Sequence, residues 1–231
     1  MDFLWNGLFQ AFSLLLSAHA ETYSAIWTTL KVSTLSITGS LLLGVPIGFL
    51  LGQHEFTGRK ALRLVMDTLL SFPTVVIGLL VYGFLSRQGP LGELGLLFTL
   101  PGIAIGQTIL GLPIVIALTA SAVEALDRRL RPTLLTLGAN ERQILLTTIC
   151  EARFSLMAAA VTAYGRIVSE VGISMMVGGN IKWYTRTITT AIALETNKGK
   201  FGMGIALGLV LLLIAFTVNL VLAVLRRRME G

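Results

Sequence analysis

The chain has 231 residues, of which 54% are hydrophobic and 13% charged, and its mean hydropathy is +0.81. An ordinary soluble domain carries about 25% charged residues, so this composition excludes a soluble protein and indicates an integral membrane protein. The formal charge of +6 would suggest nucleic acid in a soluble chain. Here the basic residues report membrane topology, and we expect no nucleic-acid partner. The single cysteine, Cys150, cannot form a disulfide within the chain.

The N-terminal residues 3–20 predict a helix that lies in the membrane interface. Large apolar residues cover most of the helical wheel, and polar residues recur at steps of three and four along one side: Asp2, Asn6, Gln10, Ser13 and Ser17. This pattern is typical of an interfacial helix and not of a spanning one. Ala18-His19-Ala20 is similar to a signal cleavage site, but no Lys or Arg precedes it, so we expect the segment to be retained.

Five apolar runs are long enough to cross a bilayer, which takes about 20 helical residues. Four of them contain no charged residue or histidine: 32–52, 68–86, 94–123 and 203–225. The remaining run, 154–177, is fourth in chain order and is apolar except for Arg166 and Glu170. Prolines lie in the first three spans, where each removes a backbone hydrogen bond and is expected to bend its helix: Pro46, Pro73 and Pro113. The sequence therefore predicts an all-α membrane fold with five transmembrane helices.

Five spans place the two termini on opposite sides of the membrane, and the basic residues choose the orientation. With the N-terminus outside, 11 Lys and Arg residues fall on the inner side and five on the outer side. The inner residues are Arg59, Lys60, Arg63, Arg128, Arg129, Arg131, Arg142, Arg153 and 226–228, and the outer ones are Arg87, Lys182, Arg186, Lys198 and Lys200. The positive-inside rule therefore predicts an outer N-terminus and a cytoplasmic C-terminus.

The longest inner loop, residues 124–153, has the pattern of two helices joined at a glycine. Pro132 suits the first turn of a leucine-rich helix that stops at Gly138. Asn140 is suited to cap a second helix, and Gln143 at its third position completes a capping-box pattern. We interpret this helix, elbow and helix on the cytoplasmic face as a docking surface for a soluble partner; a solvated connector is the alternative.

This loop resembles the coupling element of the inner-membrane permease subunits of ATP-binding-cassette (ABC) importers. Their coupling helix carries a Gly-Ala elbow, matched here by Leu137-Gly138-Ala139, although Pro132-Thr133-Leu134 replaces the usual acidic-small-small opening. The resemblance covers nearly the whole chain and points to the tungstate-type branch, related to molybdate permeases. The matching stretches are Phe72-Pro73-Thr74-Val75-Val76-Ile77-Gly78-Leu79, Gly165-Arg166-Ile167-Val168-Ser169-Glu170-Val171-Gly172, Val177-Gly178-Gly179-Asn180 and Thr189-Thr190-Ala191-Ile192-Ala193-Leu194-Glu195.

The resemblance implies a type I importer permease in which 1–231 form one permease domain that works as a homodimer in membrane lipid. An extracytoplasmic binding protein would deliver an oxyanion; tungstate fits the resemblance, while molybdate, sulfate or another anion stay open as alternatives. Two cytoplasmic ATPase subunits, holding ATP and Mg²⁺, would grip the region 131–142. The implied coupling residues are Leu137, Gly138, Ala139, Asn140, Glu141 and Arg142.

Two ionisable residues in the fourth predicted span are candidates for the translocation pathway or its gate. Arg166 and Glu170 are four residues apart, hence on one helix face, and charged groups inside a membrane are unfavourable unless they are paired or hydrated. An arginine also places a cation on the route of an anion. A structural ion pair is the alternative. Gly178, Gly179 and Asn180 follow as a possible non-helical gate element.

Several kinds of site are missing from the sequence. It has no G-x-x-x-x-G-K-[ST] loop, so energy from ATP must come from another subunit. His19, His54 and Cys150 are too few and too scattered for a metal site, and no catalytic constellation is present, so we expect no enzyme. An ion-coupled secondary carrier, which would need inverted repeats and several membrane acids, and a non-transporting scaffold are the competing functions.

Overall fold

The computed structural model describes residues 5, 9, 12–13, 20–127 and 129–230. All regular structure in this described part is helical, which confirms the all-α prediction. The interfacial helix predicted over 3–20 lies almost entirely outside the described residues, so it stays a prediction.

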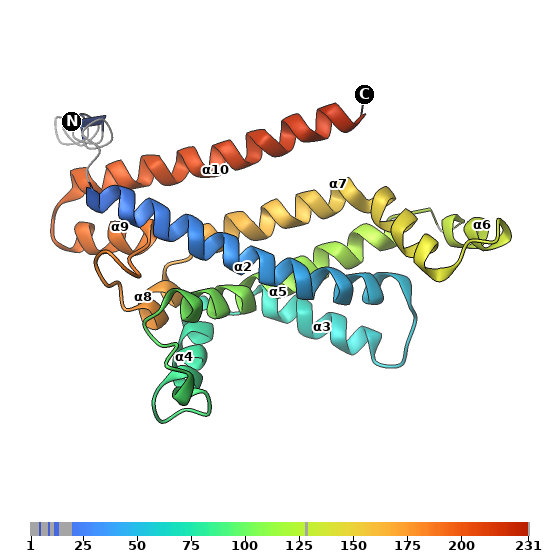
Figure 1. The fold of residues 1–231 in the computed structure, drawn as a ribbon, viewed down its shortest axis with the longest axis horizontal. Coiled ribbons are helices and arrows are strands. Elements are labelled where there is room, and N and C mark those ends of the chain that lie inside the picture. The colour runs from blue at the N-terminus through green and yellow to red at the C-terminus, as the bar shows by residue number, and fades with distance from the viewer. Residues whose placement is uncertain (1–4, 6–8, 10–11, 14–19, 128, 231) are drawn as a thin grey trace.

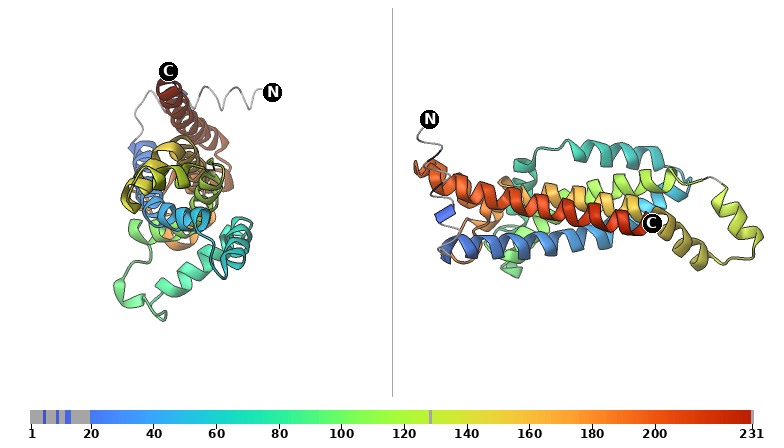
Figure 2. Two further views of the ribbon diagram at one scale, coloured as in Figure 1. Left: turned by 90° about the vertical axis from the view of Figure 1, so that its right-hand side faces the viewer. Right: turned by 90° about the horizontal axis from the view of Figure 1, so that it is seen from above.

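Four long helices lie side by side along the longest axis of the molecule (Figures 1 and 2). They are α2 (Ala20–Gln53), α5 (Leu100–Glu124), α7 (Glu141–Val168) and α10 (Phe201–Glu230). Each is long and apolar enough to cross a membrane. The short helix α6 (Leu130–Thr136) lies at one end of this bundle, and α9 (Ile188–Asn197) lies at the other. We call these the α6 end and the α9 end.

The bend expected at Pro73 is confirmed, and it divides the second predicted span, 68–86, between two helices. The chain there forms α3 (Arg59–Leu70) and α4 (Thr74–Leu85), which meet at an angle of 101° and together can make a fifth, broken span. Pro73 stands at the break with an extended backbone, φ −62° and ψ 124°. Proline lacks the N–H that would continue the helix and disfavours helical geometry in the residue before it, here Phe72. Helices α2 and α5, in contrast, continue through Pro46 and Pro113.

The third span begins at Leu100 and not at Leu94, after the short 3₁₀ helix η1 (Gly92–Leu94). Thr99 caps α5, its Oγ1 accepting a hydrogen bond of 3.2 Å from the Gly102 N–H. Pro101 occupies the first turn, where a missing N–H does no harm. Local capping therefore overrides the apolar run that precedes it.

The fourth predicted span, 154–177, is also wrong at both ends. Helix α7 already begins at Glu141, so the second helix predicted in the loop 124–153 and the span are one continuous rod. The rod ends at Val168, and a short non-helical segment separates it from the short helix α8 (Gly172–Gly178). Helix α9 was not predicted, although Thr187 and Thr190 form a capping box at its start that is visible in the sequence.

Small residues allow α2 and α5 to approach closely along the bundle. A Cβ atom at Gly48 would lie 2.7 Å from the Ile116 carbonyl oxygen, and one at Gly44 would lie 2.8 Å from Val115 Cγ1. Glycine contacts of this kind are common between membrane helices. Toward the α9 end, apolar side chains of α4, α5 and α8 form one core: Ile77, Val81, Leu85, Leu110, Ile173 and Val177.

Candidate functional site

The elbow at the α6 end has the geometry that the sequence predicted. Gly138 adopts φ +79°, a left-handed conformation that favours glycine, and its N–H donates to the Leu135 carbonyl at 3.0 Å. The Asn140 side chain accepts from the Gln143 N–H at 2.9 Å, and the Gln143 side chain accepts from the Asn140 N–H at 2.9 Å. The predicted cap and capping box are therefore confirmed.

The elbow presents its side chains to solvent. Leu137 is 77% exposed, Ala139 is half-buried, and Asn140, Glu141 and Arg142 are exposed. A large exposed leucine at a tight turn is the kind of apolar contact that a protein partner would cover. The Arg131 guanidinium lies 3.1 Å from the Glu141 carboxylate, so an ion pair spans the elbow and holds α6 against the start of α7.

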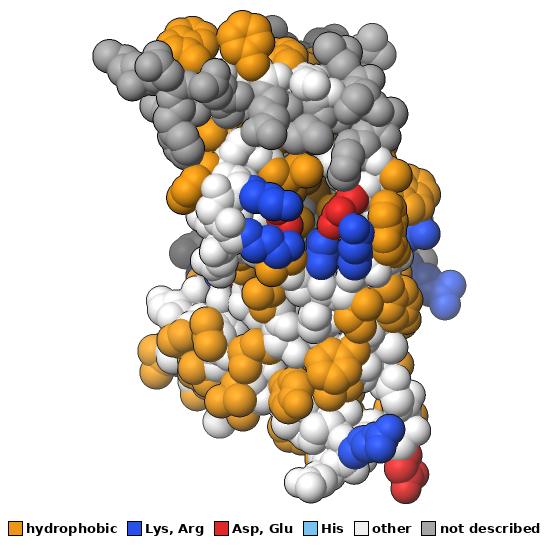
Figure 3. All heavy atoms as spheres, turned by 90° about the vertical axis from the view of Figure 1, so that its left-hand side faces the viewer, with side chains coloured by type: hydrophobic (Ala, Val, Ile, Leu, Met, Phe, Trp, Pro, Cys, Tyr) orange, Lys and Arg blue, Asp and Glu red, His pale blue; other side chains and the backbone are white. Residues whose placement is uncertain are grey.

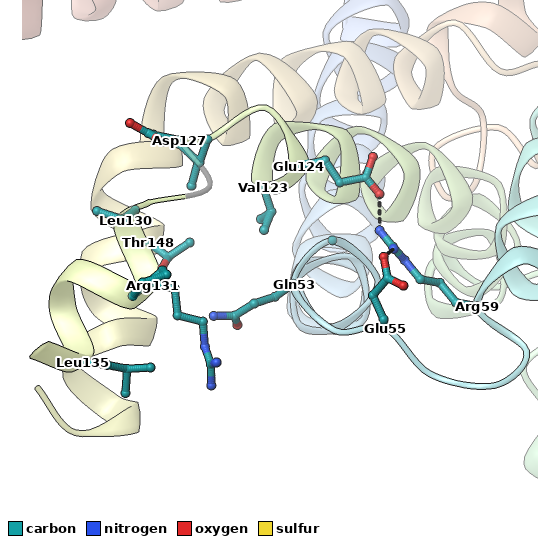
Figure 4. A pocket seen from close by; sticks show the side chains of 13 residues that line it. Gln53, Glu55, Arg59, Val123, Glu124, Asp127, Leu130, Arg131, Leu135 and Thr148 are labelled. Carbon is teal, nitrogen blue, oxygen red and sulfur yellow. Dashed lines mark hydrogen bonds and ion pairs between the residues drawn. The ribbon is translucent and has the colours of Figure 1, made fainter.

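Beside the elbow lies a cavity of about 710 Å³ between helix α6 and the nearby ends of α2 and α5 (Figure 4). Arg59 points toward Glu124 on one side of it, with Arg59 Nη2 2.6 Å from Glu124 Oε1, and Arg131 reaches into it from α6. Arg63 pairs with the same carboxylate, so α3 and the end of α5 are joined by two ion pairs. The cavity thus separates helix α6 from the ends of α2 and α5.

At the far end of α7, the predicted pair of Arg166 and Glu170 lies at the break between helices α7 and α8. Arg166 Nη1 lies 3.0 Å from Glu170 Oε2, yet the two side chains differ sharply in exposure, 42% for the arginine and 3% for the glutamate. The other carboxylate oxygen accepts from the Ile173 N–H at 3.2 Å. Glu170 lies beyond the last residue of α7 and binds the first turn of α8, so the pair bridges two helices.

The main chain at Glu170 is also held by its neighbours. Its carbonyl oxygen accepts from Thr189 Oγ1 of α9 at 2.9 Å and from Ser174 Oγ of α8 at 3.4 Å. Buried polar groups, such as this carbonyl and the carboxylate of the same residue, are stable only when they have hydrogen-bond partners. The break between α7 and α8 is therefore a hydrogen-bonded joint among three helices.

Sequence reasoning missed Gln107, which extends this joint to α5 and α2. Its Nε2 donates to Ser174 Oγ at 3.1 Å, and its Oε1 accepts from Ser36 Oγ at 3.1 Å, all three side chains being buried. An amide side chain in the middle of the apolar run 94–123 was the available signal. Such groups join neighbouring helices in membranes.

The face of α7 around Arg166 is left uncovered by the part of the chain that the structure describes. Thr162, Gly165, Arg166 and Ser169 follow the spacing i, i+3, i+4, i+7, and all are exposed. A Cβ atom at Gly165 would have no heavy atom within 4 Å. A polar, uncovered stripe inside a membrane span indicates contact with water or with another protein surface.

The predicted element Gly178-Gly179-Asn180 is partly helical. Gly178 is the last residue of α8, while Gly179 and Asn180 adopt left-handed conformations with φ +67° and +50°. A Cβ atom at Gly179 would lie 2.7 Å from Phe98 Cδ1, so the turn packs tightly on the segment before α5. Arg186 Nε donates to Asn180 Oδ1 at 3.2 Å. The element is a tight turn that ends α8, and the gate role stays a prediction.

Known proteins with similar sequences are transport permeases. Residues 44–231 match the family described as the inner membrane component of binding-protein-dependent transport systems. The chain is 50% identical to the tungstate uptake system permease TupB of Campylobacter jejuni, over 98% of this chain and 95% of that protein. It is 37% identical to TupB of Peptoclostridium acidaminophilum, over 96% and 97% of the two chains. It is 28% identical to the molybdenum transport system permease ModB of Escherichia coli, over 84% and 91%.

Solved structures of ABC transporters have the same fold. A bacterial transporter that imports the acidic polysaccharide alginate superposes with a TM-score of 0.77 at 20% identity, covering 96% of this chain and 84% of that one. The inward-facing methionine transporter MetNI superposes with a TM-score of 0.73 at 18% identity, covering 90% and 95%. The predicted type I importer permease fold is thereby confirmed. The chain is a multi-pass, non-catalytic permease subunit of the inner membrane and belongs to the family of inner-membrane components of binding-protein-dependent transport systems.

Proposed function

We propose that this chain is the permease subunit of an ATP-driven tungstate importer. The observation that carries the substrate is the 50% identity to a tungstate uptake permease over 98% of this chain. The relative named for molybdenum is more distant, at 28% identity, and a sulfate permease from Synechocystis is 25% identical. Tetrahedral oxyanions as a class therefore fit the whole group, and tungstate fits the most similar of these relatives.

The elbow is the contact for the ATPase subunits in this proposal. Its exposed residues, from Leu137 to Arg142, lie where a cytoplasmic partner can reach them, and Leu137 supplies an apolar anchor. Two ATPase subunits, which hold ATP and Mg²⁺, bind the elbows of a permease homodimer. The orientation that goes with this assembly places the α6 end and the C-terminus in the cytoplasm, as the distribution of basic residues predicts.

Helix α7 transmits the motion of the elbow to the pathway. It has 28 residues, hence a length of about 42 Å at 1.5 Å per residue, and it joins the elbow directly to the Arg166–Glu170 joint. A rigid element that connects two sites can couple them when both bias its position. The cavity beside α6 leaves room for the elbow to move relative to α2 and α5.

Arg166 serves the substrate in this mechanism. Its guanidinium is held by one ion pair but remains 42% exposed on the uncovered stripe of α7. An arginine offers several N–H donors in a plane, which suits an oxyanion. In a homodimer whose subunits face each other across these stripes, two such cations line the route. The binding protein delivers the anion to the α9 end.

The test is uptake and ATP hydrolysis in proteoliposomes that contain this chain, its ATPase and its binding protein. We expect hydrolysis to depend on both tungstate and the binding protein, and Arg166→Ala to reduce uptake at least tenfold. Arg153→Ala is the matched control, because Arg153 is an exposed arginine of the same helix. A rate of ATP hydrolysis that is the same with and without oxyanion and binding protein contradicts the proposed import function. Uptake that excess molybdate or sulfate suppresses as well as tungstate contradicts the choice of substrate.

A further inference from the structure

The α9 end carries a second cavity, of about 310 Å³, that the proposed mechanism does not use. Lys, Arg and Glu side chains gather around it in the middle of this face of the molecule (Figure 3). They come from the start of α2, from the segment between α8 and α9, from α9 itself, and from the turn between α9 and α10. The charged lining residues are Glu21, Lys182, Arg186, Glu195, Lys198 and Lys200.

The charges around this cavity are only partly balanced. Four basic side chains face two carboxylates, which leaves an excess of two positive charges. Glu21 accepts from Lys182 at 2.8 Å and from Arg186 as well, so one carboxylate neutralises two cations. Lys198 pairs with Glu195 at 2.8 Å. A small cavity with this excess favours an anion with two negative charges.

Arg186 links the cavity to the turn at the end of α8. Its guanidinium binds Glu21 on one side, while Nε donates to the Asn180 side chain at 3.2 Å on the other. Only 13% of the side chain is exposed, so the arginine is held in place by the two partners. A change of partner at Glu21 therefore acts directly on the residue that holds Asn180.

We propose that this cavity is an admission site for a tetrahedral oxyanion, in which the anion replaces the Glu21 carboxylate on Lys182 and Arg186. The inference rests on the proposed function for the identity of the anion as a substrate. The carboxylate occupies the anion position in the empty site and competes with the ligand. Because Glu21 is covalently part of the chain, it also returns to the two cations and releases the anion, which keeps the affinity low enough for passage.

Binding of free oxyanion by the assembled transporter, without binding protein or ATP, tests this site. Equilibrium dialysis against tungstate measures the dissociation constant of wild type and variants. We expect Glu21→Gln to tighten binding about fivefold, because it removes one competing negative charge at the cavity. We expect Lys200→Gln to weaken binding by about the same factor. Neither variant removes Arg186, whose Nε donates to the Asn180 side chain.

The matched control is Lys60→Gln, which removes an exposed lysine from the opposite end of the molecule and is expected to leave binding unchanged. Unchanged or weaker binding by Glu21→Gln overturns the proposal. So does a result in which Glu21→Gln alters only the affinity for the binding protein, since the cavity is then a protein-docking surface. Sulfate binding with the same response to Glu21→Gln, without tungstate binding, supports an oxyanion site and contradicts tungstate as the substrate.

Discussion

The two ends of helix α7 are built in opposite ways. At the elbow, a glycine in a left-handed conformation and an exposed ion pair between Arg131 and Glu141 join α7 to α6. At the other end, Glu170 is 97% buried and is hydrogen-bonded to α8 and α9. The elbow offers its side chains to a partner, whereas the joint at Glu170 keeps its polar groups within the protein.

This difference shows how one helix can serve both an external contact and an internal rearrangement. A partner can grip the elbow without disturbing the packing of the bundle, because the cavity beside α6 separates it from α2 and α5. The buried joint, in contrast, moves only if α8 and α9 move with it. We therefore expect substitutions at the elbow to change coupling and substitutions at the joint to change stability as well.

The largest effect should come from Gly138→Pro. Proline holds φ near −65°, which is incompatible with the observed +79°, and it removes the N–H that donates to Leu135. We expect the amount of oxyanion imported per ATP hydrolysed to fall at least tenfold, while the membrane portion still assembles. Measurement of uptake and hydrolysis in the same proteoliposomes gives this ratio.

Gly95→Pro is a closely matched control. Gly95 has φ +61° and donates its N–H to the Gly92 carbonyl at 3.2 Å, so the local strain is similar, but it lies between η1 and α5 and not at the elbow. Its ratio of import to hydrolysis should stay near that of wild type. An equal loss of coupling in both variants means that any strained turn disturbs the transporter, and the elbow then has no special role.

The next largest effect separates the two members of the buried joint. Glu170→Ala leaves Arg166 and the Ile173 N–H without their acceptor, and we expect about 3 kcal/mol less stability. Arg166→Lys keeps a cation beside the buried Glu170 carboxylate and should change stability by about 1 kcal/mol or less, yet reduce uptake strongly because it removes the planar guanidinium. Thermal unfolding in detergent, read beside uptake, distinguishes the two. Equal destabilisation by both variants would mean that Arg166 is only a structural partner.

The comparison also shows what the sequence could predict. The elbow was predictable because its signals are local: Gly138, Asn140 and Gln143 act on their own turn. The roles at the other end depend on residues far apart in the chain. The break after Val168 is held in part by Thr189, whose side chain donates to the Glu170 carbonyl from 19 residues away, and no short window around residue 170 contains that information.

Hydropathy predicted where the chain crosses the membrane but not where helices begin and end. The bend expected at Pro73 is present as the angle of 101° between α3 and α4, but the start of α5 at Leu100 was missed because the apolar run 94–123 was predicted as one helix. The continuity of α7 from Glu141 was missed for the opposite reason, because a helix that leaves the membrane becomes polar without ending. The capping residues mark the correct helix starts, because Thr99 directly precedes α5 and Thr187 directly precedes α9.

A smaller effect is expected for Gln107→Leu, which tests how far the joint extends. The two side chains are similar in size, but the substitution removes two buried hydrogen bonds, one to Ser36 and one to Ser174, for a loss of about 2 kcal/mol. Thermal unfolding measures the loss. Gln53→Leu, at the half-buried last residue of α2, is the control and should change stability little. A Gln107→Leu protein as stable as wild type would show that the joint does not depend on α5.

The smallest effect is expected for Asn140→Ala at the elbow. The substitution removes the acceptor of the Gln143 N–H, and loss of an N-cap destabilises a helix by about 1 kcal/mol. Because the first turn of α7 is exposed, this loss should loosen the start of the rod and leave the joint at Glu170 unchanged. Hydrogen exchange should therefore become faster over 141–144 only, with a modest fall in import per ATP. Asn140→Ser, which restores a capping oxygen, should recover both values. Faster exchange that reaches residues 166–170 would contradict the separation of the two ends, because a rod with independent ends does not transmit a local loosening over about 42 Å.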